Sequence, residues 1–163
     1  MIRGNAWVFG DNIDTDVIVP GKYLVGNLEQ ITGHVMEGVR PGFAQLVKPG
    51  DVLVAGRNFG AGSSREMAPA AIRASGIAAV VAVSFARIYF RNSINIGLPP
   101  VECPRGLEIK EGDTVEVDLG VGVVRIRDRS LELPCVSIPG EIRRILDVGG
   151  LEAFLASEME ARA

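Results

Sequence analysis

A glycine-rich turn followed by two serines and an arginine is the segment of this 163-residue chain best suited to chemistry. It reads Gly60-Ala61-Gly62-Ser63-Ser64-Arg65-Glu66 and follows an apolar strand predicted over residues 51–56. Glycines let backbone N–H groups approach a ligand closely, and a helix that begins behind them adds positive potential. An arginine offers a planar fork that binds a carboxylate through two hydrogen bonds. The turn therefore predicts a site for an acidic small molecule, with a serine placed to touch it.

Two further segments carry side chains suited to an acidic ligand. Asp14-Thr15-Asp16 places two carboxylates around a hydroxyl, ahead of a stretch expected to be an apolar strand. Arg87 and Arg91 are four residues apart and hence on one face of a predicted helix, next to Asn92. A serine acts as a base only as an alkoxide, so backbone donors and nearby cations must stabilise that anion.

Each of these segments also has a purely structural interpretation. Ser63-x-x-Glu66 is a capping-box pattern, in which Ser63 would accept a backbone N–H and Arg65 would be an exposed first-turn residue. The Asp-Thr-Asp segment alone is typical of a turn. The arginine pair alone is typical of a solvated helix face. Taken singly, the segments leave both interpretations open.

The elements that must position these segments alternate between strand and helix. A strand at residues 7–9 precedes the turn Gly10-Asp11-Asn12. The continuous apolar run 77–83 is typical of a strand buried on both faces. With the strand at 51–56 and a helix over 67–75, it forms a βαβ unit with a right-handed crossover. The remaining expected elements are helices near 28–38 and over 85–95, 139–148 and 151–159, and a β-hairpin or meander over 112–133. These elements predict one mixed α/β domain spanning residues 1–163.

Composition narrows the functional classes. A net charge of −3 and a pI near 5.2 argue against a nucleic acid partner. No apolar run approaches the roughly 20 residues that span a bilayer, and residues 1–7 lack a signal-peptide pattern, so a cytoplasmic location is expected. Cys103 and Cys135 match no metal-binding spacing and are interpreted as buried small hydrophobic residues. The single His34 is interpreted as solvated, so no metal site is expected in this chain.

Taken together and in order, three segments resemble the aconitase superfamily. They are residues 11–24 (DNIDTDVIVPGKYL), 56–66 (GRNFGAGSSRE) and 84–99 (SFARIYFRNSINIGLP). The resemblance is to the small swivel domain of that family, which some members encode as a separate small subunit. It is strong over residues 7–100 and rests on length and β-rich character beyond them. It implies a swivelling β/β/α domain of the aconitase C-terminal type.

The resemblance also implies roles for individual residues. Ser63 corresponds to the catalytic base, and Arg65 to the residue that binds a substrate carboxylate, with Ser64 and Gly62 beside it. Asp16 corresponds to a member of the active-site hydrogen-bond network. The implied reaction removes water from adjacent carbons of a di- or tricarboxylate and adds it back, and a [4Fe-4S] cluster acts as Lewis acid on the hydroxyl. The chain is thus expected to belong to a hydro-lyase.

Two cysteines cannot supply the three thiolates that such a cluster requires. The cluster is therefore expected on a separate large subunit, in a heterodimer or heterotetramer, with the active site formed where the two chains meet. On this view the isolated chain is inactive, and Ser63 and Arg65 lie on an exposed concave surface.

In this family a short loop contacts the variable substituent of the substrate, and here it corresponds to Tyr23-Leu24-Val25-Gly26. An arginine at the third place is similar to homoaconitases, which bind an additional carboxylate. Val25 is apolar, so a carboxylate against it would be costly, whereas an isopropyl group would gain about 0.8 kcal/mol per buried methylene. This favours 3-isopropylmalate, as in leucine biosynthesis. Gly26 leaves 2,3-dimethylmalate, citramalate or methylmalate as alternatives; homoaconitate and a non-catalytic anion-binding module are further ones.

Overall fold

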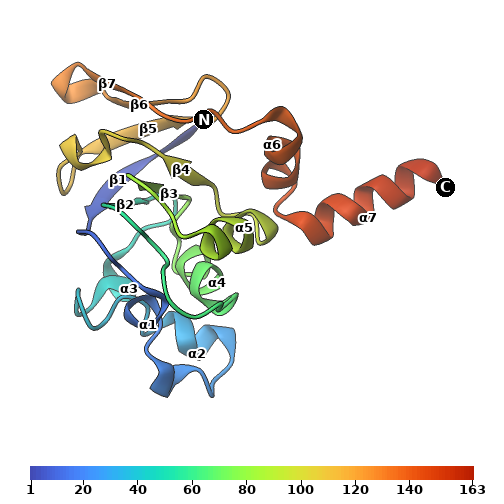
Figure 1. Ribbon diagram of the computed structural model, residues 1–163, viewed down its shortest axis with the longest axis horizontal. Helices are drawn as coiled ribbons and strands as arrows, with labels where there is room; N and C mark the ends of the chain where they lie inside the picture. Colours follow the sequence, from blue (N-terminus) through green and yellow to red (C-terminus); the bar gives the residue numbers. More distant parts are fainter.

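The computed structural model describes residues 1–163 and contains one seven-stranded sheet with helices packed against it (Figure 1). The strands follow the order β4-β3-β2-β1-β5-β6-β7. They are β1 (Ile2–Val8), β2 (Val52–Ala55), β3 (Ala79–Ala82), β4 (Pro100–Glu102), β5 (Thr114–Asp118), β6 (Val123–Ile126) and β7 (Leu131–Pro134). The helices are α1 (Thr15–Ile18), α2 (Leu28–Thr32), α3 (Phe43–Leu46), α4 (Met67–Ala74), α5 (Arg87–Asn95), α6 (Gly140–Asp147) and α7 (Leu151–Arg162). Three 3₁₀ turns, η1 (Gly21–Tyr23), η2 (Gly106–Glu108) and η3 (Arg127–Arg129), complete the chain.

Strand β1 divides the sheet into a parallel and an antiparallel half. Its second part pairs with β2 in parallel, with Ala6 opposite Val52, and β3 and β4 continue the parallel half. Its first part pairs with β5 antiparallel, with Ile2 opposite Val117, and β6 and β7 continue the meander. The predicted α/β class, the β2–α4–β3 unit and the meander are therefore confirmed.

The parallel strands separate two hydrophobic cores. Alternate residues of a strand point to opposite faces, so Leu53 and Ala55 enter a core of 20 buried residues that includes side chains of the helices. Val52 and Val54 enter a second core of 12 residues, shared with strands β5, β6 and β7, which curl over that face of the sheet. Because both faces are covered, a strand of this half must be apolar throughout, which explains the continuous apolar run at residues 77–83.

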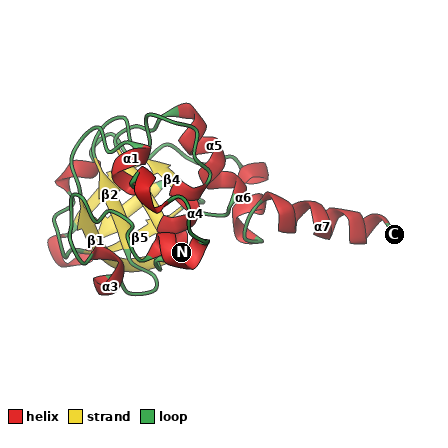
Figure 2. Cartoon of the chain, turned by 90° about the horizontal axis from the view of Figure 1, so that it is seen from below, coloured by secondary structure: helices red, strands yellow, loops and turns green.

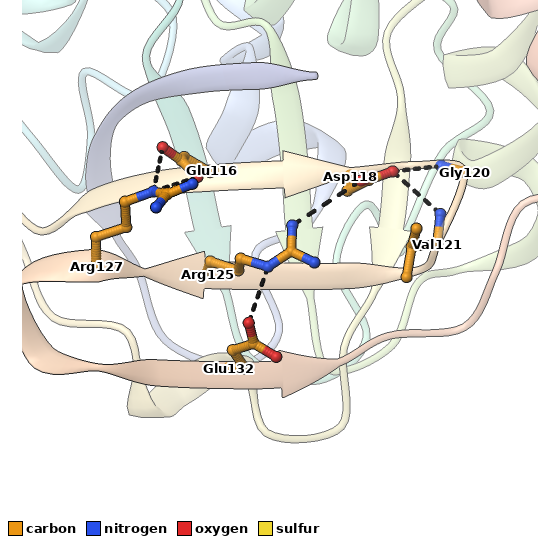
Figure 3. Close-up of polar contacts among 7 residues, drawn as sticks. All are labelled: Glu116, Asp118, Gly120, Val121, Arg125, Arg127 and Glu132. Carbon is orange, nitrogen blue, oxygen red and sulfur yellow. Dashed lines mark hydrogen bonds and ion pairs between the residues drawn. The ribbon is translucent and has the colours of Figure 1, made fainter.

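The outer face of the meander carries cross-strand ion pairs (Figure 3). Arg125 of β6 bonds Glu132 of β7 at 2.9 Å, and Arg127 bonds the carboxylate of Glu116 on β5 at 2.8 Å. Asp118 accepts two backbone N–H groups of the β5–β6 turn at 3.0 Å each, and these bonds lower the pKa of its carboxyl. The Arg125–Glu132 pair is partly exposed and contributes little stability by itself, whereas the Glu116 carboxylate of the second pair is buried. Both pairs join neighbouring strands and support their register.

Helix α7 extends away from the body of the molecule (Figures 1 and 2). One ion pair ties it to α6, between Arg144 and Glu158 at 2.8 Å, and the same arginine lies over the ring of Phe154. The helices predicted over 139–148 and 151–159 are confirmed, with the break at Gly149 and Gly150. None of the helices combines the length and the apolar composition that a bilayer crossing would require.

Three sequence predictions need correction. The segment after Asp14 was expected to lead into a strand, but it forms helix α1, because the Asp14 carboxylate accepts the N–H of Val17 at 2.8 Å and caps the first turn. The helix near 28–38 ends after Thr32 and continues as turns. The first strand begins at Ile2 rather than Trp7, since its first residues pair with β5.

The two cysteines lie next to each other where β4 and β7 end. Cys103 is fully buried, as predicted, whereas Cys135 is only half-buried. The Cys103 thiol donates to the carbonyl of Pro134 at 3.7 Å and the Cys135 thiol to that of Leu133 at 3.4 Å. The neighbouring thiol lowers the pKa of Cys103 and, together with burial, raises that of Cys135. The main chain brings them together, because Val136 donates its N–H to the carbonyl of Glu102 at 2.8 Å.

Candidate active site

The three segments that resemble the aconitase superfamily lie at the same edge of the sheet. They follow β1, β2 and β3, which are adjacent and parallel, so their carboxyl ends lie together. In open parallel sheets this edge is where ligands commonly bind. The sheet therefore collects side chains that are far apart in the sequence at one place.

Backbone hydrogen bonds tie the first two of these loops together. The N–H of Gly60 donates to the carbonyl of Ile13 at 2.7 Å, and the N–H of Thr15 donates to the carbonyl of Ala61 at 2.8 Å. The Thr15 hydroxyl adds a third bond, to the carbonyl of Ser63 at 3.1 Å. The turn that carries Ser63 is thus held against the start of α1.

The third loop is joined to the second in the same way. The N–H of Phe59 donates to the carbonyl of Ser84 at 3.0 Å, and the N–H of Ala86 donates to the carbonyl of Phe59 at 2.9 Å. Because Ala86 immediately precedes α5, these bonds fix where that helix begins relative to the glycine-rich turn.

Glycine is required within this turn for two reasons. Gly60 and Gly62 have φ angles of +80° and +96°, which side chains of L-residues rarely adopt. In addition, a Cβ at Gly60 would lie 2.1 Å from Cγ of Tyr89. The ring of Tyr89 is almost fully buried and packs edge-on against Phe59 at 5.1 Å. The turn therefore approaches α5 as closely as a bare backbone allows.

Between the turn and α5 lies an open cavity of about 310 Å³. One wall comes from α1 and the turn, and the other from the first two turns of α5. The residues that line it are Thr15, Gly60, Gly62, Ser63, Arg65, Ala86, Arg87, Ile88, Tyr89 and Asn92. The cavity unites parts of all three segments and has an arginine on each wall, Arg65 on one and Arg87 on the other.

Ser63 is exposed in this cavity, and its hydroxyl forms no hydrogen bond with the rest of the chain. Helix α4 begins at Met67, and its N-terminal cap, Glu66, forms no side-chain capping bond. The capping-box interpretation of Ser63 and Glu66 is therefore wrong. The hydroxyl is free to meet a ligand.

Arg65 is held in place by its own chain. Its guanidinium forms an ion pair with Asp16 and donates to the carbonyl of Val19 at 3.3 Å. The arginine side chain is 22% exposed, whereas that of Asp16 is 64% exposed. Asp16 does not border the cavity and is linked to it only by its ion pair with Arg65. A guanidinium fixed on one edge keeps its other edge available for a carboxylate.

The loop of residues 23–26 lies beside the site and does not line the cavity. The ring of Tyr23 stacks on His34 with centroids 3.7 Å apart, and its hydroxyl lowers the pKa of Glu37 through a hydrogen bond. Leu24 packs against the core, and Val25 is 95% exposed. The N–H of Leu24 donates to the carbonyl of Gly21 at 3.1 Å, and Gly21 lies close to the guanidinium of Arg65. His34 is partly covered by the stacked ring rather than freely solvated.

Helix α5 contributes more to the cavity than its sequence suggested. Arg87 and Asn92 border it. Arg87 also lines a neighbouring hollow with Phe90, Arg91 and Glu102, and Arg91 borders only that hollow. The sequence did not single out Tyr89, whose burial raises the pKa of its hydroxyl and keeps it neutral. Nothing in the sequence around Tyr89 marks it as part of the site; only the contact with Gly60 reveals its position.

Comparison with known proteins places this geometry in a family. Residues 41–106 match the aconitase C-terminal domain. The small subunit 1 of 3-isopropylmalate dehydratase from Methanopyrus kandleri is 52% identical over 161 residues, which cover 97% of this chain and 94% of that protein. The chain belongs to this small-subunit family of the aconitase superfamily.

Two further relatives carry names that refer to two different substrates. A crystal structure of 3-isopropylmalate dehydratase from Methanocaldococcus jannaschii superimposes with a TM-score of 0.93 at 45% identity, covering 99% of this chain and 96% of that one. The methanogen homoaconitase small subunit of Methanothermobacter thermautotrophicus is 48% identical over 152 residues, which cover 93% of this chain and 88% of that protein. Sequence identity over the whole chain therefore does not indicate which of the two named substrates this chain would bind.

The close approach of Gly60 to Tyr89 yields a stability prediction. Gly60→Ala should lower the free energy of unfolding by about 2–4 kcal/mol, since it adds left-handed backbone strain and a steric overlap. Urea denaturation measures the loss. Gly38→Ala is the control, because no atom lies within 4 Å of a Cβ at that exposed position, and it should change stability by less than about 1 kcal/mol. Equal stability of both variants would contradict the packing described for the turn.

Proposed function

We propose that this chain is the small subunit of a hydro-lyase that interconverts 2-isopropylmalate and 3-isopropylmalate, the reaction used in leucine biosynthesis. Residues 1–163 act as one swivel-type domain that supplies half of the active site. Ser63 carries the proposal, because its exposed hydroxyl has no partner in the chain and shares a cavity with Arg65 and Arg87. The names of the relatives support the same reaction class.

Ser63 is proposed as the base that removes the carbon-bound proton. The alkoxide form must be stabilised, and guanidinium groups on both walls of the cavity are suited to that. The proton moves from the substrate carbon to the serine oxygen while the hydroxyl leaves the adjacent carbon, which gives an unsaturated diacid. Water then adds with the opposite regiochemistry, and Ser63 returns the proton.

Neighbouring residues are proposed to bind and orient the substrate. Arg65 binds one carboxylate through the edge of its guanidinium that Asp16 leaves free. Asp16 is then a positioning residue that belongs to the active-site network through this ion pair. Ser64 is exposed beside Ser63, and the backbone of Gly62 borders the cavity, so both can donate hydrogen bonds to the same ligand.

The family's [4Fe-4S] cluster is assigned to the large subunit, since the side chains of this chain do not fit it. The two cysteines are buried or half-buried near β7, and no three metal-binding side chains lie together. When bound, the cluster polarises the departing hydroxyl. The large subunit closes the open side of the cavity, and the complex is a heterodimer or a heterotetramer that acts in the cytoplasm.

The loop of Tyr23, Leu24, Val25 and Gly26 is proposed to meet the variable group of the substrate. Val25 is almost fully exposed here, as expected for a side chain that becomes covered only when the large subunit docks. An apolar residue there favours an isopropyl group over a carboxylate. Homoaconitate is the second candidate substrate, because a homoaconitase small subunit is as similar to this chain as several isopropylmalate relatives are.

Replacement of the proposed base tests the reaction. In the complex with a cluster-loaded large subunit, Ser63→Ala should lower kcat for 3-isopropylmalate about 100- to 10,000-fold, the usual contribution of general base catalysis. The dissociation constant of a non-reacting diacid should change little, because the serine acts on the reacting carbon.

Ser157→Ala on the projecting helix α7 serves as the matched control and should retain full activity. Normal turnover by the Ser63 variant would refute the assignment of the base.

Substitution within the specificity loop tests the substrate. Val25→Arg should raise the ratio of kcat/KM for homoaconitate to that for 3-isopropylmalate by about 10- to 100-fold, the range expected for one charge-assisted hydrogen bond. Val121→Arg, at another exposed valine in the β5–β6 turn, is the control. If both variants keep the original ratio, the loop does not determine specificity.

A further inference from the structure

The α5 wall of the cavity carries a cation that the assignments above leave without a role. Arg87 is the first residue of α5, is exposed, and borders the cavity opposite Ser63 and Arg65. It forms no ion pair and no side-chain hydrogen bond with the rest of the chain. The bond from Ala86 to Phe59 fixes the start of the helix, so this guanidinium is anchored at its base and free at its tip.

The charges of the two walls differ. Arg65 is paired with Asp16, so that wall of the cavity is close to neutral before a ligand arrives. No carboxylate borders the cavity to offset Arg87. The opening turn of α5 also leaves its N–H groups without acceptors inside the helix, which adds positive potential on the same wall. The α5 wall is therefore the more attractive one for an anion.

A dicarboxylate has two charged ends, and Arg65 can bind only one of them. We infer that Arg87 binds the second carboxylate of the substrate, so that the diacid is held between the α4 and α5 sides of the cavity with its reacting carbons near Ser63. This inference rests on the proposed function and adds a residue to it. Arg91 does not share this role, because it does not border the cavity; it borders only the neighbouring hollow, which Arg87 also lines.

Calorimetry on the complex with the large subunit tests this inference. The ligand is 2-isopropylsuccinate, which lacks the reacting hydroxyl, together with its two half-amides. Arg87→Ala should weaken binding of the diacid about 10- to 100-fold, and Arg87→Lys should lose less, since it keeps the charge but not the planar fork. Arg91→Ala should stay within about threefold of the wild type.

The half-amides identify a direct contact. One half-amide presents its neutral end to Arg87, so the charged contact is already missing and Arg87→Ala should weaken its binding by less than about threefold. The other half-amide keeps that contact, and Arg87→Ala should weaken its binding as much as that of the diacid. Changing the residue and the ligand separately and together forms a double-mutant cycle, which isolates the interaction between Arg87 and that carboxylate. Three results would overturn the inference. Arg87→Ala could weaken binding of all three ligands equally, it could leave binding of the diacid unchanged, or its effect could come from weaker association with the large subunit.

These results separate the inference from the proposed function. If the wild-type complex binds the diacid and hydrates its substrate while Arg87→Ala binds normally, only the role of Arg87 is wrong. If the wild-type complex neither binds the diacid nor turns over substrate, the proposed function fails as well.

Discussion

The peptide at Gly60 is enclosed on two sides, and the geometry of the site depends on it. Its N–H donates to the carbonyl of Ile13, and its α-carbon lies against the ring of Tyr89, where a Cβ would come within 2.1 Å. This contact sets the distance between the turn and α5, and hence the width of the cavity. The buried aromatic cluster below and the parallel strands behind keep both sides rigid, so the serine and the arginines stand on fixed supports.

Some polar side chains of the site are held by partners within the chain, and others have none. Arg65 is restrained by Asp16 and by the carbonyl of Val19, whereas the Ser63 hydroxyl and the Arg87 guanidinium have no partner in the chain. A free hydroxyl between two cations is an arrangement in which an alkoxide becomes accessible. The cavity is also open, and the side chain of Val25 in the neighbouring loop is almost fully exposed. Both features suit half of a site that a second subunit completes.

Much of this could be predicted from the sequence, for identifiable reasons. Apolar runs of strand length gave β2 and β3, because strands covered on both faces need no polar residues, and the three ordered motifs led to the family. Helix α1 was missed, since a single capping bond from Asp14 outweighed an apolar stretch that resembles a strand. The different positions of Arg87 and Arg91 could not be predicted either. Spacing puts both on one helix face, and only the packing of α5 against the glycine-rich turn shows that Arg87 borders the cavity and Arg91 does not.

The central claim is that this chain holds one half of a catalytic centre and that the other half arrives on a second protein. The most direct measurement is the rate of 3-isopropylmalate dehydration by this chain alone, by a cluster-loaded large subunit alone, and by the two mixed at increasing ratios. Neither protein alone should turn over the substrate, and the rate should rise to saturation on mixing. Turnover by the large subunit alone at the rate of the mixture would contradict this claim.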